Sequence, residues 1–140
     1  MDVLLDHIVL NVRDIPTSLE FYKYILQFEP ERVPEYEAGK VPFPSVRINA
    51  NTVIDLFPPK LWGGGQDATA KLHNLNHFCL ALEFTDWAAL RQRLVAADLE
   101  LHRDRSRNWG AKGSGISMYF FDPDGNEIEA RYYEDGQSLT

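Results

Sequence analysis

The feature that most constrains this chain is an internal repeat. The run Asp6–Val12 resembles the run Asn76–Leu82, and each places a histidine at the head of an apolar, strand-like segment. Each half then closes on an acid between apolar neighbours. The histidine precedes this acid by 48 residues in the first half (His7 to Asp55) and by 52 in the second (His77 to Glu129). Two such halves related by a pseudo-twofold would bring two histidines and two carboxylates together, so the repeat predicts a metal site formed by duplication.

Size and charge narrow the class of protein. A chain of 140 residues is expected to form one domain, residues 1–140, with a substantial core. Its net charge of −7 disfavours a nucleic-acid surface, which would need clustered Lys and Arg. The single cysteine, Cys79, excludes an internal disulfide framework. The chain shows neither a signal peptide nor an apolar run long enough for a membrane span, so we expect a cytoplasmic protein that binds a small molecule.

The first half reads as a strand, a helix and two further strands. Alternating β-rich residues predict the first strand, and Asp14 is a suitable N-cap for a helix that ends near Gln27. The segment between that helix and the next strand gives no clear prediction. Pro58 and Pro59 stop the last strand. The predicted strands are 5–12, 45–49 and 52–57, with a tight turn at Ala50–Asn51.

The second half repeats this plan after a glycine-containing linker, residues 58–74. Thr85 is expected to cap a helix with one apolar face, and Asp122–Gly125 has the composition of a tight turn. The tail from Glu134 is expected to fray. The predicted strands are 76–84, 99–105, 114–122 and 126–133, with a polar loop at 106–113 that contains Trp109.

These elements predict an α+β fold of two tandem βαβββ modules, residues 4–57 and 75–133, that form a curved, partly open mixed sheet around a concave metal site. Side chains alternate between the faces of a strand. If the apolar residues of each strand meet the helix, the opposite, concave face receives four potential ligands and their neighbour Asn11. These ligands are His7, Asp55, His77 and Glu129.

Residues 4–133 resemble the vicinal oxygen chelate superfamily, which includes glyoxalase I, fosfomycin-resistance enzymes, extradiol dioxygenases and the metal-free bleomycin-resistance proteins. The stretches that carry the resemblance are Asp6–Val12 with Asp14, Leu19–Tyr22 and, above all, Tyr119–Glu129. The resemblance implies a homodimer with one divalent metal ion per site. It also implies that the ligands are His7, His77 and Glu129, a set that suits Zn, Mn, Ni, Co or Fe(II).

Further residues are candidates for the chemistry around the metal. Asp55 is either a ligand, a residue that holds a bound water, or a base, because its side chain is one methylene shorter than the acid that glyoxalase-type members carry. The resemblance places Tyr119 beside the substrate. Arg131 shares the parity of Glu129 and could bind an anionic substrate, and Asn11 and Trp109 are candidate substrate contacts. Other possible sources of positive charge are Arg47, Arg105 and Lys112.

Three functions are consistent with these residues. The first is a metal-dependent isomerase, lyase or epoxide-opening transferase that acts on a small oxygen-chelating substrate. The second is a ring-cleaving Fe(II) dioxygenase, and the third is a non-catalytic drug-binding resistance protein. Val9 stands where fosfomycin-resistance enzymes carry threonine, which argues against fosfomycin itself.

Overall fold

The computed structural model describes residues 2, 5–63, 75, 77–110, 112–134 and 139, and it leaves the side chain of Trp109 outside the description. The chain divides into two compact units, Met1–Leu72 and His73–Thr140, and the boundary falls within the predicted linker. Three segments used in the predictions lie outside the described residues: most of the linker (64–74), Asn76 and part of the tail (135–138). Among the helices of the described residues, none combines the length and apolar character needed to cross a bilayer.

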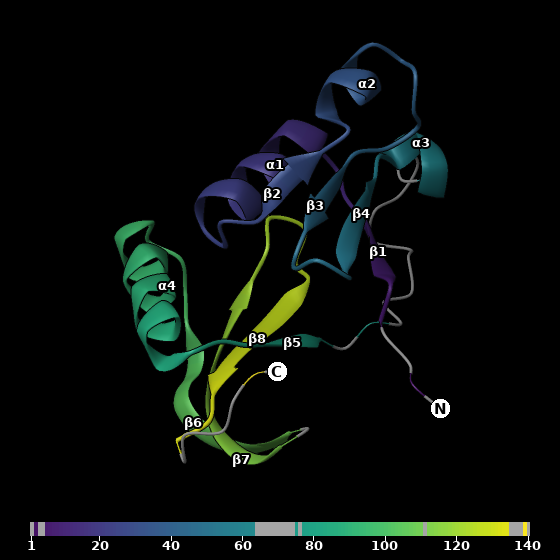
Figure 1. Ribbon diagram of the computed structural model, residues 1–140. Helices are drawn as coiled ribbons and strands as arrows, with labels where there is room; N and C mark the ends of the chain where they lie inside the picture. The colour runs from purple at the N-terminus through teal and green to yellow at the C-terminus, as the bar shows by residue number, and fades with distance from the viewer. Residues whose placement is uncertain are drawn as a thin grey trace. The chain divides into compact units, whose positions relative to one another are not determined.

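The first unit is a four-stranded mixed sheet with the strand order β1-β4-β3-β2. The β1–β4 pair is parallel and the other pairs are antiparallel. Helix α1 packs against β2, β3 and β4 (Figure 1). The elements are β1 (His7–Asn11), α1 (Ile15–Tyr24), β2 (Glu29–Glu31), α2 (Val33–Glu37), β3 (Ser45–Arg47), β4 (Val53–Phe57) and α3 (Pro59–Trp62).

Helix α1 begins where the sequence predicts. The Asp14 side chain accepts a hydrogen bond from the backbone N–H of Thr17 at 3.0 Å, which satisfies one of the unpaired donors of the first turn. The helix ends at Tyr24, three residues earlier than predicted. Gln27 has a φ of 59°, a left-handed conformation that cannot continue an α-helix.

Residues 28–44 contain two elements that the sequence did not predict, β2 and α2. A three-residue strand and a five-residue helix are both too short to show a hydrophobic period. Helix α3 was likewise not predicted in the linker. At its end the Trp62 indole N–H donates to the backbone oxygens of Phe57 at 3.0 Å and Val12 at 3.2 Å, so this tryptophan is fixed against the first sheet.

The second unit repeats the same topology, with the strand order β5-β8-β7-β6. Its β5–β8 pair is parallel, and the pairs β7–β8 and β6–β7 are antiparallel. Two tandem βαβββ modules are therefore present, as predicted, each with its own four-stranded mixed sheet. The elements are β5 (Phe78–Ala81), α4 (Phe84–Ala96), β6 (His102–Gly110), β7 (Gly113–Phe121) and β8 (Glu127–Tyr132).

Helix α4 packs on β8, and the buried indole N–H of Trp87 donates to the backbone oxygen of Ala130 at 2.8 Å. The predicted Thr85 cap is wrong. The helix begins two residues earlier than that cap implies, at Phe84, and the preceding Glu83 makes no capping hydrogen bond with its side chain. Apolar contacts of Trp87, Leu90 and Leu94 hold the helix instead.

The prediction of a loop at residues 106–113 is also wrong, because β6 continues to Gly110 and places Trp109 in a strand. Strands β6 and β7 form a long, bent hairpin (Figure 1). Their register shifts between His102 and Ser106, and Arg103 and Arg105 both have positive φ. Such a bulge breaks the period of two by which a strand is recognised in sequence.

The two sheets hold their acids at the same register. Asp55 pairs with Val9 across β4 and β1, and Glu129 pairs with Cys79 across β8 and β5. In both sheets the histidine lies two residues before the residue that pairs with the acid: His7 precedes Val9, and His77 precedes Cys79. The alternate positions of β4 and β8 are fully buried apolar residues: Ile54 and Leu56 in the first unit, and Ile128 and Ala130 in the second.

Candidate metal centre

In the second unit a histidine and a carboxylate face each other. The Nε2 atom of His77, just before β5, lies 3.4 Å from Oε2 of Glu129 on β8. The histidine side chain is 34% exposed and the glutamate side chain 4%. One partner is thus reachable from solvent while the other is held inside the unit.

Two donors hold the second oxygen of Glu129. The Ser117 hydroxyl and the Arg131 guanidinium each donate to Oε1 at 2.7 Å. Burial disfavours the charged form of Glu129, but hydrogen bonds from Ser117, Arg131 and Tyr119 outweigh it, so the pKa of Glu129 lies below its ordinary value. The carboxylate therefore stays ionised at neutral pH, and its other oxygen, Oε2, is directed to His77.

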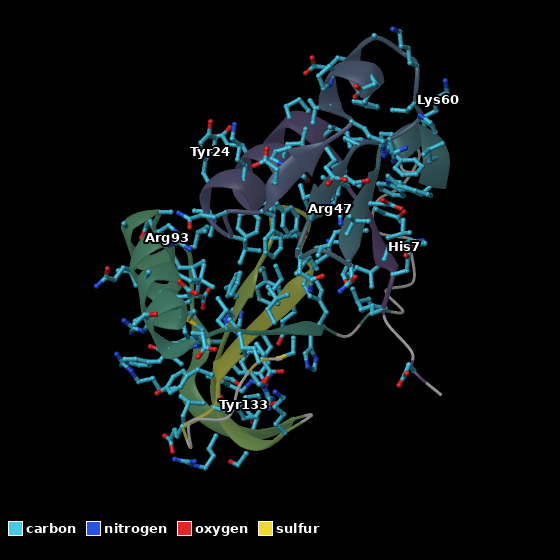
Figure 2. All side chains as sticks on the ribbon, viewed as in Figure 1. His7, Tyr24, Arg47, Lys60, Arg93 and Tyr133 are labelled. Atoms are coloured by element: carbon cyan, nitrogen blue, oxygen red, sulfur yellow. The ribbon has the colours of Figure 1, made fainter. Side chains whose placement is uncertain are left out.

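Arg131 is the centre of this network. It is 4% exposed, and its Nε donates to Sγ of Cys79 at 3.2 Å while Nη1 contacts the backbone oxygen of Asn108 at 3.4 Å. Nη1 also lies 3.5 Å from the hydroxyl of Tyr133, just beyond the end of β8 (Figure 2). Burial disfavours its charge, but the hydrogen bonds to Glu129, Tyr133 and Cys79 outweigh that effect and raise the pKa of Arg131. The structure thus shows Arg131 bound to Glu129. The predicted contact of Arg131 with a substrate stays a prediction.

Tyr119 lies beside both histidine and carboxylate. It is 3% exposed, and its ring meets the His77 imidazole edge-on, with the centroids 5.9 Å apart. Burial, together with a hydrogen bond to Glu129 and the negative charge of that residue, raises the pKa of Tyr119. The phenol therefore keeps its proton at neutral pH and can act as a hydrogen-bond donor.

Cys79 lines the same face of β5. Burial and the charge of Glu129 raise the pKa of its thiol to about 11, although part of the side chain reaches the surface. The thiol is thus protonated at neutral pH and is a poor nucleophile. Its role in this unit is to accept the Arg131 hydrogen bond.

The pair His77–Glu129 fits the edge of a metal coordination shell. Bonds of about 2.0–2.2 Å from a tetrahedral metal to nitrogen and oxygen place two ligand atoms about 3.4 Å apart. The separation of Nε2 and Oε2 is 3.4 Å. Over the described residues, no three His, Cys, Asp or Glu side chains gather into a group that could hold a metal ion by themselves. The predicted set of three ligands stays a prediction.

The predicted ligand of the first unit, His7, lies on β1 (Figure 2). Its Nδ1 contacts a carboxylate oxygen of Asp6 at 2.7 Å. This hydrogen bond raises the pKa of His7, with smaller contributions from the charges of Asp55 and Asp6. A carboxylate on one ring nitrogen orients the ring and directs the other nitrogen, Nε2, outward, which is the usual arrangement of a histidine that binds metal.

Asp55 lies on β4 and accepts a hydrogen bond from the Ser45 hydroxyl at 2.6 Å. Arg47, which lies on β3 and is labelled in Figure 2, is bound to Glu31 of the neighbouring β2. Asn11 is the last residue of β1 and is half-buried. Trp109 lies on β6, but its side chain is outside the described part of the chain. The substrate roles of Asn11 and Trp109 therefore stay predictions.

Sequence reasoning missed two residues of this site. Ser117 shares the parity of Tyr119 on β7, and that signal could have identified it. Arg103 lies over the Tyr119 ring, with its guanidinium carbon 3.7 Å from the centroid. The sequence shows a basic segment, Arg103–Arg107, before the Tyr119 strand, but it does not place Arg103 on Tyr119, because the bulge in β6 decides where its side chain goes.

Comparison with known proteins identifies the family. Residues 4–130 match the model of the Glyoxalase/Bleomycin resistance protein/Dioxygenase superfamily, and the chain belongs to this superfamily. The family includes many metal-dependent enzymes, and the match extends over both modules and the His77–Glu129 pair.

Two relatives illustrate the range of similarity. The chain is 27% identical over 129 residues to virulence protein STM3117 of Salmonella typhimurium, covering 92% of this chain and 83% of that protein. The crystal structure of that protein matches with a TM-score of 0.73 at 23% identity, over 96% of this chain and 99% of that one. The fosfomycin resistance protein FosX from Listeria monocytogenes matches with a TM-score of 0.65 at 21% identity, over 99% and 98%. The structural matches support the fold.

Proposed function

We propose that this protein is a divalent-metal-dependent enzyme that acts on a small substrate with neighbouring oxygen atoms, in an isomerase, lyase or transferase reaction. The observation that carries the proposal is the His77–Glu129 pair. Nε2 and Oε2 lie 3.4 Å apart, while Oε1 is already held by Ser117 and Arg131. An ionised carboxylate whose outer oxygen faces an imidazole has the chemistry and spacing of two metal ligands.

In this proposal His77 and Glu129 hold the metal ion, and the third ligand that the repeat and the family imply, His7, stays a prediction. A bound divalent ion supplies a Lewis acid for the neighbouring oxygens of the substrate. Zn, Mn, Ni, Co and Fe(II) all suit two imidazoles and a carboxylate. The residues around the metal then orient the substrate and donate or accept its protons.

Arg131 and Ser117 act on Glu129. By binding Oε1 they fix the orientation of the carboxylate and keep it charged, which leaves Oε2 for coordination. Hydrogen bonds of this kind to a ligand carboxylate maintain metal affinity. Both residues are positioning residues, since their contacts are to the ligand and not to the reacting atoms.

Tyr119 is the proposed hydrogen-bond donor to the substrate, and its O–H, which donates to Glu129 in the free protein, would turn to the substrate oxygen. Its raised pKa keeps the phenol protonated, and its ring is next to His77. A hydroxyl at this place can donate a hydrogen bond to a substrate oxygen as negative charge develops there. Asp55 is the proposed base or water-holding residue of the first unit, with its carboxylate oriented by Ser45.

Metal content is the decisive measurement. Wild type, His77→Ala and Glu129→Gln are stripped of metal, reconstituted separately with each of the five ions and measured by inductively coupled plasma mass spectrometry. Glu100→Gln is the matched control, because it makes the same change at a side chain that is 86% exposed. We expect near-stoichiometric metal in wild type and in the control, and loss of it in both site variants.

Circular dichroism of each variant verifies that the chain still folds. The proposal is overturned if reconstituted wild type holds none of the five ions, or if His77→Ala retains as much as the control. Oxygen uptake with catechols and Fe(II) then separates the ring-cleaving alternative from a reaction without redox chemistry. The homodimer implied by the family resemblance stays a prediction that light scattering tests.

A further inference from the structure

The two modules carry an arginine at the same structural position. Arg103 follows His102, which pairs with Tyr119, and Tyr119 pairs with Glu129. In the first unit Arg32 takes this place, because it follows the residue that pairs with Ser45, which in turn pairs with Asp55. In each sheet, therefore, the arginine directly follows the residue that lies two strands across from the acid.

Both arginines share a conformation that is uncommon for residues with a Cβ. The φ of Arg32 is 60° and that of Arg103 is 43°. Both also place the guanidinium over an aromatic ring, that of Phe43 at 4.5 Å and that of Tyr119 at 3.7 Å. A strained backbone persists only where its surroundings hold it, and such outliers cluster at functional sites. Its recurrence in both modules argues against an accident of one loop.

We propose that Arg103 binds an oxyanion, the carboxylate or phosphonate-type group of a small anionic substrate, beside Tyr119 and His77. This inference rests on the proposed function only in placing the reacting atoms at His77 and Glu129. The guanidinium carbon is 3.7 Å from the Tyr119 centroid, and that centroid is 5.9 Å from the His77 ring. The Arg103 guanidinium carbon and the centre of the His77 ring are thus no further apart than the sum of these two distances. A separation of this size can be spanned by one small substrate.

The surroundings of Arg103 leave it able to take a ligand. Its side chain is 57% exposed, and its Nη2 contacts Oε1 of Glu127 at 3.3 Å. An exposed ion pair of this kind is weak, so an incoming oxyanion can replace Glu127. Stacking on Tyr119 fixes the plane of the guanidinium, and a fixed plane favours two parallel hydrogen bonds to one oxyanion. Arg131, by contrast, is 4% exposed, and its charge compensates Glu129.

The test uses the metal-free, full-length protein, so that it does not depend on the metal proposal. Methylphosphonate and acetate are titrated separately while the arginine side-chain N–H and Tyr119 ring signals are followed by NMR, with N-methylacetamide as the neutral probe. Arg103→Gln is compared with Arg105→Gln, its matched control. Arg105 lies in the same bulge, also has positive φ, and has a 63% exposed side chain near Asp104.

We expect at least one anion to shift the Arg103 and Tyr119 signals, the neutral probe to shift neither, and Arg103→Gln to weaken binding by about tenfold or more. Arg105→Gln should bind as wild type does, which would remove Arg105 from the possible sources of positive charge that the sequence offers. The tighter of the two anions assigns a carboxylate or a phosphonate-type group. The inference is overturned if neither anion shifts these signals, or if both variants bind equally well. If the protein binds the anion but cannot hold metal, Arg103 remains an anion-binding residue and only the proposed metal-dependent activity is rejected.

Discussion

The two sheets place an acid at the same register and surround it differently. Glu129 is 3% exposed and receives hydrogen bonds from Ser117 and Arg131, whereas Asp55 is half-buried and receives one from Ser45. The difference comes from the strand position two residues after the acid, which is Arg131 in β8 and Phe57 in β4. A repeated topology thus preserves where a carboxylate lies, while one substitution decides whether it can be buried with its charge compensated.

The histidines differ in the same sense. His77, just before β5, faces Glu129 on the neighbouring strand β8, whereas His7 faces Asp6, its neighbour in sequence. The second unit therefore couples its histidine and acid through tertiary structure, while the first orients its histidine locally. This contrast is the basis of four predictions, from the largest expected effect to the smallest.

Replacing Arg131 with methionine should be the most destabilising change. It leaves Glu129 buried without its cation, and breaking a buried pair in this way costs about 3–5 kcal/mol. The control is Arg47→Met in the first unit, whose pair with Glu31 is about one-third exposed on each side and should contribute about 0–1 kcal/mol. Urea unfolding at neutral pH measures the loss of unfolding free energy in both variants. Equal losses in the two variants would contradict the contrast between the sheets.

A smaller effect concerns serines that donate to the two acids. Ser117→Ala removes a hydrogen bond to the buried Glu129 carboxylate and should cost about 1.5–3 kcal/mol. Ser45→Ala removes the corresponding bond to the half-buried Asp55 and should cost about 0.5–1.5 kcal/mol. The two variants are compared by urea unfolding, and a larger loss for Ser45→Ala would reverse the proposed ranking of the sheets.

The pH dependence of stability should carry the signature of Glu129. Because its folded-state pKa lies below the ordinary 4.5, ionisation of Glu129 contributes stability that is fully present above pH 4.5 and is lost as pH falls through the folded-state value. Unfolding free energies measured as pH falls below 4.5 should therefore decrease more steeply in wild type than in Glu129→Gln. Parallel curves would show that the carboxylate is not stabilised by the fold.

His7 should show the opposite sign and the smallest consequence for stability. Its contact with Asp6 raises the pKa above the ordinary 6.5, so the contribution is present below pH 6.5 and is lost as pH rises through the folded-state value. An NMR titration of the imidazole should give a pKa above 6.5 in wild type and a lower one in Asp6→Asn. An unchanged pKa in that variant would remove Asp6 as the orienting group.

Much of the fold could be predicted because it depends on local patterns. Alternation of apolar residues located most of the strands, Asp14 marked the start of α1, and the repeat predicted two modules with the same strand order. The failures fall where no period exists: the three-residue β2, the short α2, and β6, in which a bulge at Arg103 and Arg105 interrupts the alternation.

The sequence by itself determined which residues of each module lie at the same register, since a strand period of two and a repeated spacing suffice for that. Only tertiary structure decided their surroundings. The pairing of β7 with β8 brings Ser117 and Tyr119 to Glu129, and the bulge in β6 turns Arg103 onto Tyr119. The hydrogen bonds from β7 and the ring stacking depend on distances between strands that are separate in the chain, and no local pattern encodes such distances.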